Sequence, residues 1–192
     1  MGEFNIYGEF IDLAPLIELF LEKGQSREYK KGEYFCRVGD RGLYMGYLKE
    51  GSFRYTCDGS DGKEHILSYA FDNDIFGNYS SLQNQSPSIL NIQAIQKSLV
   101  YELSISAVNE FFNSDMHTQY FGRRISEVVL YSIAQRIVSM YCDTPEERYM
   151  TLTKRCPDIL NRITLRELAS FIAVTPETLS RIRKKMLLNR KS

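Results

Sequence analysis

Near its C-terminal end the chain carries polar and basic side chains of the types that hydrogen-bond to nucleic acid. Arg181 can donate two hydrogen bonds to O6 and N7 of guanine, and Glu177 can accept one from N4 of cytosine. Arg183, Lys184 and Lys185 suit phosphates, which position a protein on DNA without reading its bases. The side chains that we expect at such an interface are Thr164, Thr175, Pro176, Glu177, Thr178, Ser180, Arg181, Arg183, Lys184 and Lys185.

Local signals predict two short helices that would position these side chains. Thr164 and Glu167 have the spacing of a capping box, in which each side chain satisfies a backbone N–H at the start of a helix. Thr175 is a good N-cap for the second helix, and Pro176 follows at the first helical position. In the connecting turn, a left-handed Ala173 would carry strain that glycine avoids. The pattern predicts a helix-turn-helix, and the alternative is a solvated basic helix. The predicted buried residues are Leu168, Ala169 and Ile172 on the first helix and Leu179, Ile182 and Met186 on the second.

The net charge of zero hides two halves of opposite sign. Residues 151–192 hold ten Lys and Arg against three Asp and Glu, a net charge of +7. Residues 1–150 hold fourteen basic and twenty-one acidic residues, a net charge of −7. Such asymmetry predicts two domains with different partners, the basic one binding a polyanion in a salt-dependent way. We expect a cytoplasmic protein with no membrane partner, because long apolar runs and a signal peptide are absent.

The four cysteines, at positions 36, 57, 142 and 156, lack the close spacing of a metal or iron–sulfur site. Scattered free thiols fit a reducing compartment, and we expect them to pack in the core. A redox-sensing role for one of them is the alternative.

The first hundred residues change from a helical pattern to one of short strands. An amphipathic helix is predicted over residues 8–24. Between Gly32 and Gly77 lie eight of the twelve glycines, and β-branched and aromatic residues alternate with polar ones. Strands are predicted over residues 43–48, 52–57, 64–69, 88–95 and 99–103. Closely spaced short strands indicate a small barrel or jelly roll.

Beyond Ser104 the pattern becomes helical, with a short helix over residues 106–113 and a long one over residues 117–141. The long helix is apolar on more than one side, so it must be covered by more than one neighbour. We expect its own barrel on one side and the same helix of a second subunit on the other. The residues expected at that dimer helix are Phe121, Ile125, Val128, Val129 and Ile133. Domains are predicted over residues 1–114, 115–142 and 143–192, with a helix starting at Pro145 and a break at residues 156–158.

A β-roll, a long helix and a terminal helix-turn-helix together resemble the Crp/Fnr family of regulators. The resemblance covers nearly the whole chain and is most specific in residues 62–69, 74–77 and 163–182. It implies an α+β fold: a double-stranded β-helix (jelly-roll) domain, a long dimerisation helix and an all-α helix-turn-helix domain. It also implies a homodimer on a palindromic DNA site and contact with RNA polymerase. Only eleven residues follow Arg181, so the chain resembles a short branch without the family's β-hairpin wing.

Departures from the family pattern concern the effector. Cyclic-nucleotide-binding members carry a Glu for the ribose and an Arg for the cyclic phosphate, whereas this chain has Asn78 in place of the Glu. Ser86, Pro87 and Ser88 stand where the Arg is needed, and a buried phosphate without a cation would be poorly compensated. We therefore expect no tight cyclic AMP binding, and we expect no cofactor.

An unidentified small molecule could still occupy the pocket, with Arg123 or Arg124 supplying the missing charge. The alternative is a filled scaffold without a ligand. The candidate pocket residues are Tyr69, Phe76, Gly77, Asn78, Tyr79, Ser80, Ser86, Ser88, Tyr120, Arg123 and Arg124.

Other functions have less support in the sequence. A cupin-like enzyme needs clustered histidines and a carboxylate around a metal, but His65 and His117 are the only histidines and lie far apart. Haem binding would rest on His65 alone. A protein-docking module is the remaining alternative, and the charge of residues 151–192 argues against it. The sequence therefore predicts a DNA-binding transcription regulator that is not an enzyme.

Overall fold

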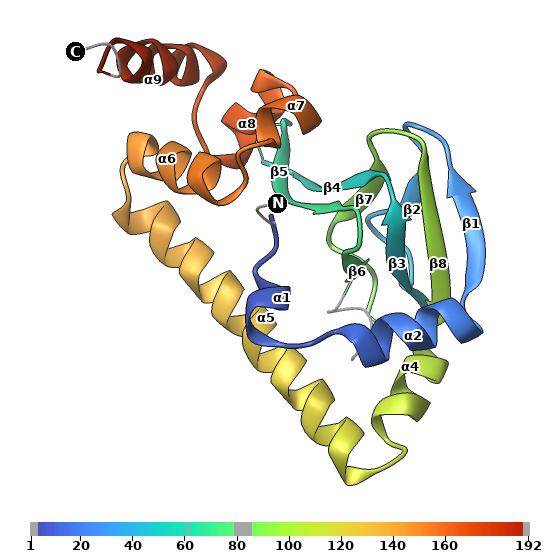
Figure 1. Cartoon of the computed structure of the whole chain (residues 1–192). Coiled ribbons are helices and arrows are strands. Elements are labelled where there is room, and N and C mark those ends of the chain that lie inside the picture. The colour runs from blue at the N-terminus through green and yellow to red at the C-terminus, as the bar shows by residue number, and fades with distance from the viewer. Residues whose placement is uncertain (1–3, 61, 79–85, 190–192) are drawn as a thin grey trace. The chain divides into compact units, whose positions relative to one another are not determined.

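The computed structural model describes residues 4–60, 62–78 and 86–189. The chain divides into two compact units (Figure 1). The roll unit is Asn5–Val129, and the helical unit is Leu130–Ser192 together with Met1–Phe4. Among the described residues, no helix combines the length and the apolar character that a membrane span needs.

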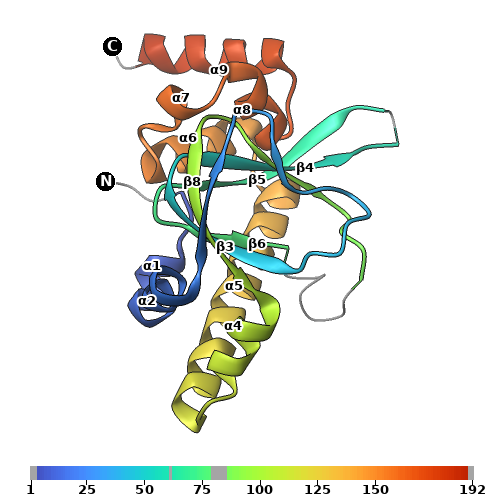
Figure 2. The same ribbon diagram turned by 90° about the vertical axis from the view of Figure 1, so that its right-hand side faces the viewer.

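The roll unit contains two four-stranded antiparallel sheets, as expected for a jelly roll (Figures 1 and 2). The first sheet has the order β1 (Gln25–Tyr29), β8 (Ser98–Ser104), β3 (Tyr44–Glu50) and β6 (Ile75–Gly77). The second has the order β2 (Tyr34–Cys36), β7 (Asn91–Ala94), β4 (Ser52–Asp58) and β5 (Glu64–Phe71).

Aromatic rings fill the space between the two sheets. Phe53 is fully buried, stacks on Phe76 at 4.7 Å between ring centroids, and meets the edge of Tyr29 at 5.3 Å. Gly46 faces the same core, because a Cβ at this position would lie 2.6 Å from the Phe76 ring. The glycine thus lets β3 pass close to the aromatic core.

The sequence prediction missed three strands, β1, β2 and β6. β1 reads Gln-Ser-Arg-Glu-Tyr, and only Tyr29 of its residues is buried. It is held by antiparallel pairing with β8, from Gln25–Glu102 to Tyr29–Ser98. β2 and β6 are three residues long. The five predicted strands correspond to β3, β4, β5, β7 and β8.

The single helix predicted over residues 8–24 is wrong, because two helices occupy this stretch. They are α1 (Tyr7–Phe10) and α2 (Ala14–Lys23). Ile11 is extended, the Asp12 carboxylate accepts a hydrogen bond from the Ala14 N–H, and Pro15 lies in the first turn of α2. Proline is compatible with a helix start and not with a helix interior, so the chain restarts here. The buried face of α2 is Leu16, Leu19 and Phe20.

Two further helices follow the roll, close to the predicted ranges. α4 (Ile105–Phe112) begins where the Ser104 hydroxyl accepts a hydrogen bond from the Ala107 N–H. α5 (Met116–Cys142) starts in the roll unit and continues into the helical unit. Gly122 allows α5 to approach α4, because a Cβ there would lie 2.9 Å from the ring of Phe112.

The helical unit continues with α6 (Pro145–Arg155), α7 (Ile159–Arg162), α8 (Leu165–Phe171) and α9 (Pro176–Asn189). The short helix α7 was not predicted, although the preceding break at residues 156–158 was. Phe4 is buried in this unit, with its ring 5.3 Å from that of Phe171. The helices α8 and α9 contact each other, and Leu168 of α8, Ile172 just after it and Leu179 of α9 are fully buried.

Candidate DNA interface and ligand cavity

The α8–turn–α9 segment has the caps that the sequence predicted. Thr164 and Glu167 form the complete capping box of α8, and the Thr175 hydroxyl accepts from the Thr178 N–H at 3.2 Å. Pro176 is the first residue of α9. Ala173 adopts a left-handed conformation with φ of 55°, and its strain is therefore built into the turn. These local interactions fix the angle at which α9 leaves α8.

The predicted DNA-contacting residues lie mostly on the solvent side of this segment. Thr178 and Arg183 are half-buried, while the exposed members are Thr164, Thr175, Pro176, Glu177, Ser180, Arg181, Lys184 and Lys185. The hydroxyls of Thr164 and Thr175 are hydrogen-bonded to their own helix starts. The side chains left to reach a groove are therefore mainly those of Glu177, Ser180, Arg181 and Lys184.

The charged side chains of α9 differ in the groups that they interact with. The pKa of Glu177 is held below its ordinary value by its own backbone N–H, then by the Thr175 hydroxyl, with a smaller contribution from the charge of Arg181. Lys185 instead binds Glu146 of α6, at 2.8 Å from Nζ to Oε1. Lys185 is thus partly neutralised, whereas Arg181 and Lys184 remain exposed cations on the outer side.

Two arginines that the sequence reasoning did not select hold the end of α8 in place. Arg136 donates to the Phe171 carbonyl at 2.8 Å, with its guanidinium 3.9 Å from the centre of the Phe171 ring. Arg148 donates to the Ile172 carbonyl at 2.9 Å. Burial, and then the nearby charges of Arg155 and Arg148, lower the pKa of Arg136 to about 10. Cations at a helix C-terminus are favourable, so these contacts stabilise the turn. Their only sequence signal is their charge.

The residues predicted for a dimer helix do not share one face. Phe121 and Ile125 pack against the roll unit's own apolar cluster, which includes Leu16, Tyr47 and Val108. Val128 is buried, and Val129 is half-buried. Phe121 and Ile125 lie one helical turn apart, are half-buried and contact their own roll, so their part in a dimer contact stays a prediction. Of the five, Ile133 is exposed, and so are Leu130, Ile137, Val138 and Tyr141.

At the positions where the resemblance led us to expect nucleotide contacts, the described side chains bind one another. Asn78 is buried, and its Nδ2 donates to the Ser88 hydroxyl at 2.6 Å. That hydroxyl donates in turn to the Leu90 carbonyl at 2.6 Å. Burial raises the pKa of the neighbouring Cys36 thiol, so the cluster is neutral. Asn78 and Ser88 therefore hydrogen-bond to each other here and offer no positive charge to a phosphate.

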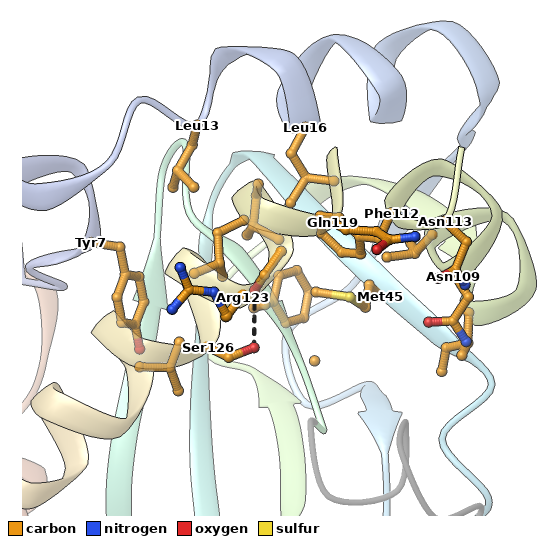
Figure 3. Close-up of a pocket in the computed structure, with 18 of the residues that line it drawn as sticks. Tyr7, Leu13, Leu16, Met45, Asn109, Phe112, Asn113, Gln119, Arg123 and Ser126 are labelled. Atoms are coloured by element: carbon orange, nitrogen blue, oxygen red, sulfur yellow. Dashed lines mark hydrogen bonds between the residues drawn. The ribbon is translucent and has the colours of Figure 1, made fainter. Parts of the chain in front are cut away.

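A cavity of about 670 Å³ lies elsewhere in the roll unit, between the first sheet and the helices that cover it (Figure 3). Met45 and Ile75 contribute from the first sheet, Tyr55 contributes from β4 of the second sheet, and α1, α2, α4 and α5 supply further walls. Among the described residues, its lining is Tyr7, Leu13, Leu16, Met45, Tyr55, Ile75, Phe76, Gly77, Ile105, Val108, Asn109, Phe112, Asn113, Gln119, Gly122, Arg123, Ile125, Ser126 and Val129.

Only part of the predicted effector pocket borders this cavity. Phe76, Gly77 and Arg123 do, while Asn78 and Ser88 belong to the neutral cluster described above. Tyr69 is buried in β5 and stacks on Phe71 at 5.7 Å. Tyr120, Arg124, Ser86 and Tyr69 are not part of the lining. Tyr79 and Ser80 lie outside the described residues. Tyr7, Asn109 and Asn113 carry no sequence signal for a cavity, and packing alone brings them to it.

Metal chemistry has no support among the described residues, where no group of three or more His, Cys, Asp or Glu side chains could hold an ion. The described cysteines, at positions 36, 57, 142 and 156, are all free thiols.

Comparison with known proteins identifies a matching family model and a similar curated protein. Residues 26–115 match the family model "Cyclic nucleotide-binding domain". The "cAMP-activated global transcriptional regulator CRP" of Pasteurella multocida (strain Pm70) is 24% identical over 185 residues, covering 90% of this chain and 87% of that protein.

Two solved structures have the same fold. FixK2 from Bradyrhizobium japonicum matches with a TM-score of 0.73 and 18% identity, covering 86% of this chain and 85% of that one. The c-di-GMP-responsive global regulator CLP of Xanthomonas campestris matches with a TM-score of 0.68 and 18% identity, covering 92% of each chain. Residues 26–115 thus match a cyclic nucleotide-binding domain, and the chain has the same fold as FixK2 and CLP.

Proposed function

We propose that the chain is a sequence-specific DNA-binding transcription regulator that inserts α9 into the major groove. The main support is the α8–turn–α9 segment, whose capped helices leave Glu177, Arg181 and Lys184 on the solvent side. Arg181 would read guanine and Lys184 would contact phosphate. The net charge of +7 over residues 151–192 supports this assignment. Such a protein would act in the cytoplasm, and at a promoter it would meet RNA polymerase.

The regulator would act as a homodimer. The exposed apolar side chains of α5, among them Leu130, Ile133 and Ile137, support a helix-to-helix contact with a second copy. Two-fold symmetry then predicts a palindromic site with half-sites about 34–36 Å apart.

We further propose that cyclic AMP is not a tight ligand. The hydrogen bonds among Asn78, Ser88 and Leu90 support this, because they use the groups that a cyclic phosphate would need. A buried phosphate would also lack a cation at these described positions.

Selection of genomic DNA fragments on the purified protein, without added ligand, tests the DNA-binding proposal. An enriched palindrome is the expected result, and binding should weaken steeply with salt. If binding occurs with no enriched sequence under any effector condition, the assignment of a base-reading helix is wrong.

Arg181→Ala and Lys184→Ala separate reading from positioning on the selected site. Arg181→Ala should cost about 1–3 kcal/mol and relax one base position, whereas Lys184→Ala should weaken binding to all sequences alike. Lys30→Ala is the matched control, because it removes one exposed positive charge from the roll unit. The dissociation constants of the three protein variants for single-base variants of the site distinguish these outcomes. Equal behaviour of Arg181→Ala and Lys30→Ala would contradict the proposed reading face.

A further inference from the structure

The cavity of the roll unit has an apolar interior and a polar rim. Leu16, Phe76 and Val108 are buried at its walls. Asn109, Asn113 and Gln119 are exposed and line it too, and no hydrogen bond of their side-chain amides to another described residue is seen. Figure 3 draws Tyr7 and Arg123 toward one end of the cavity and Asn109 and Asn113 toward the other. The volume of about 670 Å³ lies within the range of small-molecule sites.

The only charged side chain in the described lining is that of Arg123. Arg123 binds the Glu127 carboxylate one turn along α5, and Arg124 binds the other oxygen of the same carboxylate at 2.6 Å. One carboxylate therefore serves two guanidinium groups, which leaves this cluster with one excess positive charge. If Arg123 turned toward a ligand, Glu127 would stay paired with Arg124.

We propose that this cavity binds a small organic molecule with an apolar body and a single carboxylate, which pairs with Arg123. The apolar walls favour a hydrocarbon or aromatic body, and one excess positive charge matches one negative charge. A phosphate dianion fits less well, because the second charge would be uncompensated near apolar walls. The site lies between the first sheet and the helices that cover it, whereas Asn78 and Ser88 hydrogen-bond to each other.

The ligand would join parts of the roll unit that are far apart in sequence. It would touch α2 at Leu16, the sheet at Met45 and α5 between Gln119 and Val129. Binding would therefore fix this part of α5 against the sheet. The binding claim stands whether or not the chain binds DNA, and only a regulatory role of the ligand would rest on the proposed function.

Titration calorimetry on the full chain tests the proposal with two pairs of probes, octanoate with octanamide and 2-naphthoate with 2-naphthamide. Each amide keeps the apolar body and lacks the charge. We expect at least one acid to bind with one molecule per chain, about tenfold or more tighter than its amide, as a charge-assisted hydrogen bond would give. Saturable binding of neither acid, or equal affinity for acid and amide, overturns the proposal.

Four variants locate the site and the charge. Arg123→Gln should reduce the affinity for the acid to that for the amide. Lys30→Gln is its matched control, because it removes an exposed positive charge of the roll unit that does not line the cavity. Glu127→Gln should tighten binding of the acid alone, since it releases Arg123. Ser126→Trp should abolish binding of both probes by filling the cavity. Thermal melting confirms that each variant is folded. Acid binding that is unaffected by Arg123→Gln, or that is weakened equally by Lys30→Gln, would contradict the assigned partner. Binding unchanged by Ser126→Trp would show that the probe binds elsewhere.

Discussion

The surface of α9 and the cavity of the roll unit are assembled over very different distances along the chain. The α8–turn–α9 segment takes its geometry from neighbours, such as Thr164 with Glu167 and Thr175 with Thr178. The cavity instead brings together Tyr7, Met45, Ile75, Asn109 and Arg123, which come from five different elements. A single change should thus act locally in the first region and across several elements in the second.

Phe53→Ala should have the largest effect on stability. The ring is fully buried and stacked on Phe76, so its loss should cost about 3–5 kcal/mol through lost burial and a cavity in the core. Because Phe76 also borders the ligand cavity, probe binding should weaken as well. Hydrogen exchange should show reduced protection over both sheets. The control is Phe10→Ala, whose ring is 51% exposed and whose loss should cost far less. Equal losses for the two variants would contradict the assigned core.

Thr164→Ala should have a smaller and more local effect. It removes the hydroxyl that accepts from the Glu167 N–H, and loss of an N-cap costs about 1 kcal/mol. Hydrogen exchange should report lower protection in α8 and α9 and unchanged protection in β3 and β8. Thr151→Ala, an exposed threonine inside α6, is the control and should change stability little. Loss of protection throughout the roll unit would break the contrast between the two regions.

The same contrast explains what the sequence could predict. The ends of α4 and α5 were predicted to within a residue from the change to helical periodicity beyond Ser104. The start of α8 was predicted from its capping box, because Thr164 lies at the helix end that it satisfies. β1 was missed because its stability comes from pairing with β8, more than seventy residues away along the chain, and its own residues are mostly polar. The restart at Pro15 was a readable signal that the apolar periodicity masked.

For the candidate sites, prediction depended on how each residue acts. Arg181 and Lys184 could be selected by charge and helical position. Phe121 and Ile125 were assigned to a dimer contact, because periodicity identifies an apolar residue without identifying its partner. Asn109 and Asn113 carry no sequence signal for a cavity, since the packing of α4 against α5 brings them there.

Ala173→Gly should stabilise the helical unit by about 0.5 kcal/mol. A left-handed L-residue costs about 1–2 kcal/mol, and glycine removes this cost while losing more entropy on folding. Chemical denaturation of the full chain, with protection of α8 and α9 as a local readout, measures the change. Ala134→Gly is a control of opposite sign, because glycine in the middle of α5 should destabilise by about 1 kcal/mol. Destabilisation by both variants would show that the turn is not strained.

The acid sensitivity of the α6 cap should be the smallest effect. The Thr144 N–H and hydroxyl both donate to the Glu147 carboxylate at 2.8 Å, and they hold its pKa below the ordinary value. Because the pKa is lower in the folded state, the stabilisation is present above the unfolded-state pKa and is lost as the pH falls through the folded-state value.

Protection of α6 should therefore decline in mildly acidic solution before that of the sheets does. Glu147→Gln keeps an acceptor for the Thr144 N–H and removes the titration, so its protection should vary less with pH over the same range. Glu146→Gln, the neighbouring residue that binds Lys185 instead, is the control and should retain the wild-type decline. If Glu147→Gln declines as steeply as the wild type, the acid response comes from another carboxylate, and the cap of α6 would be stabilised by its backbone hydrogen bonds without help from the charge.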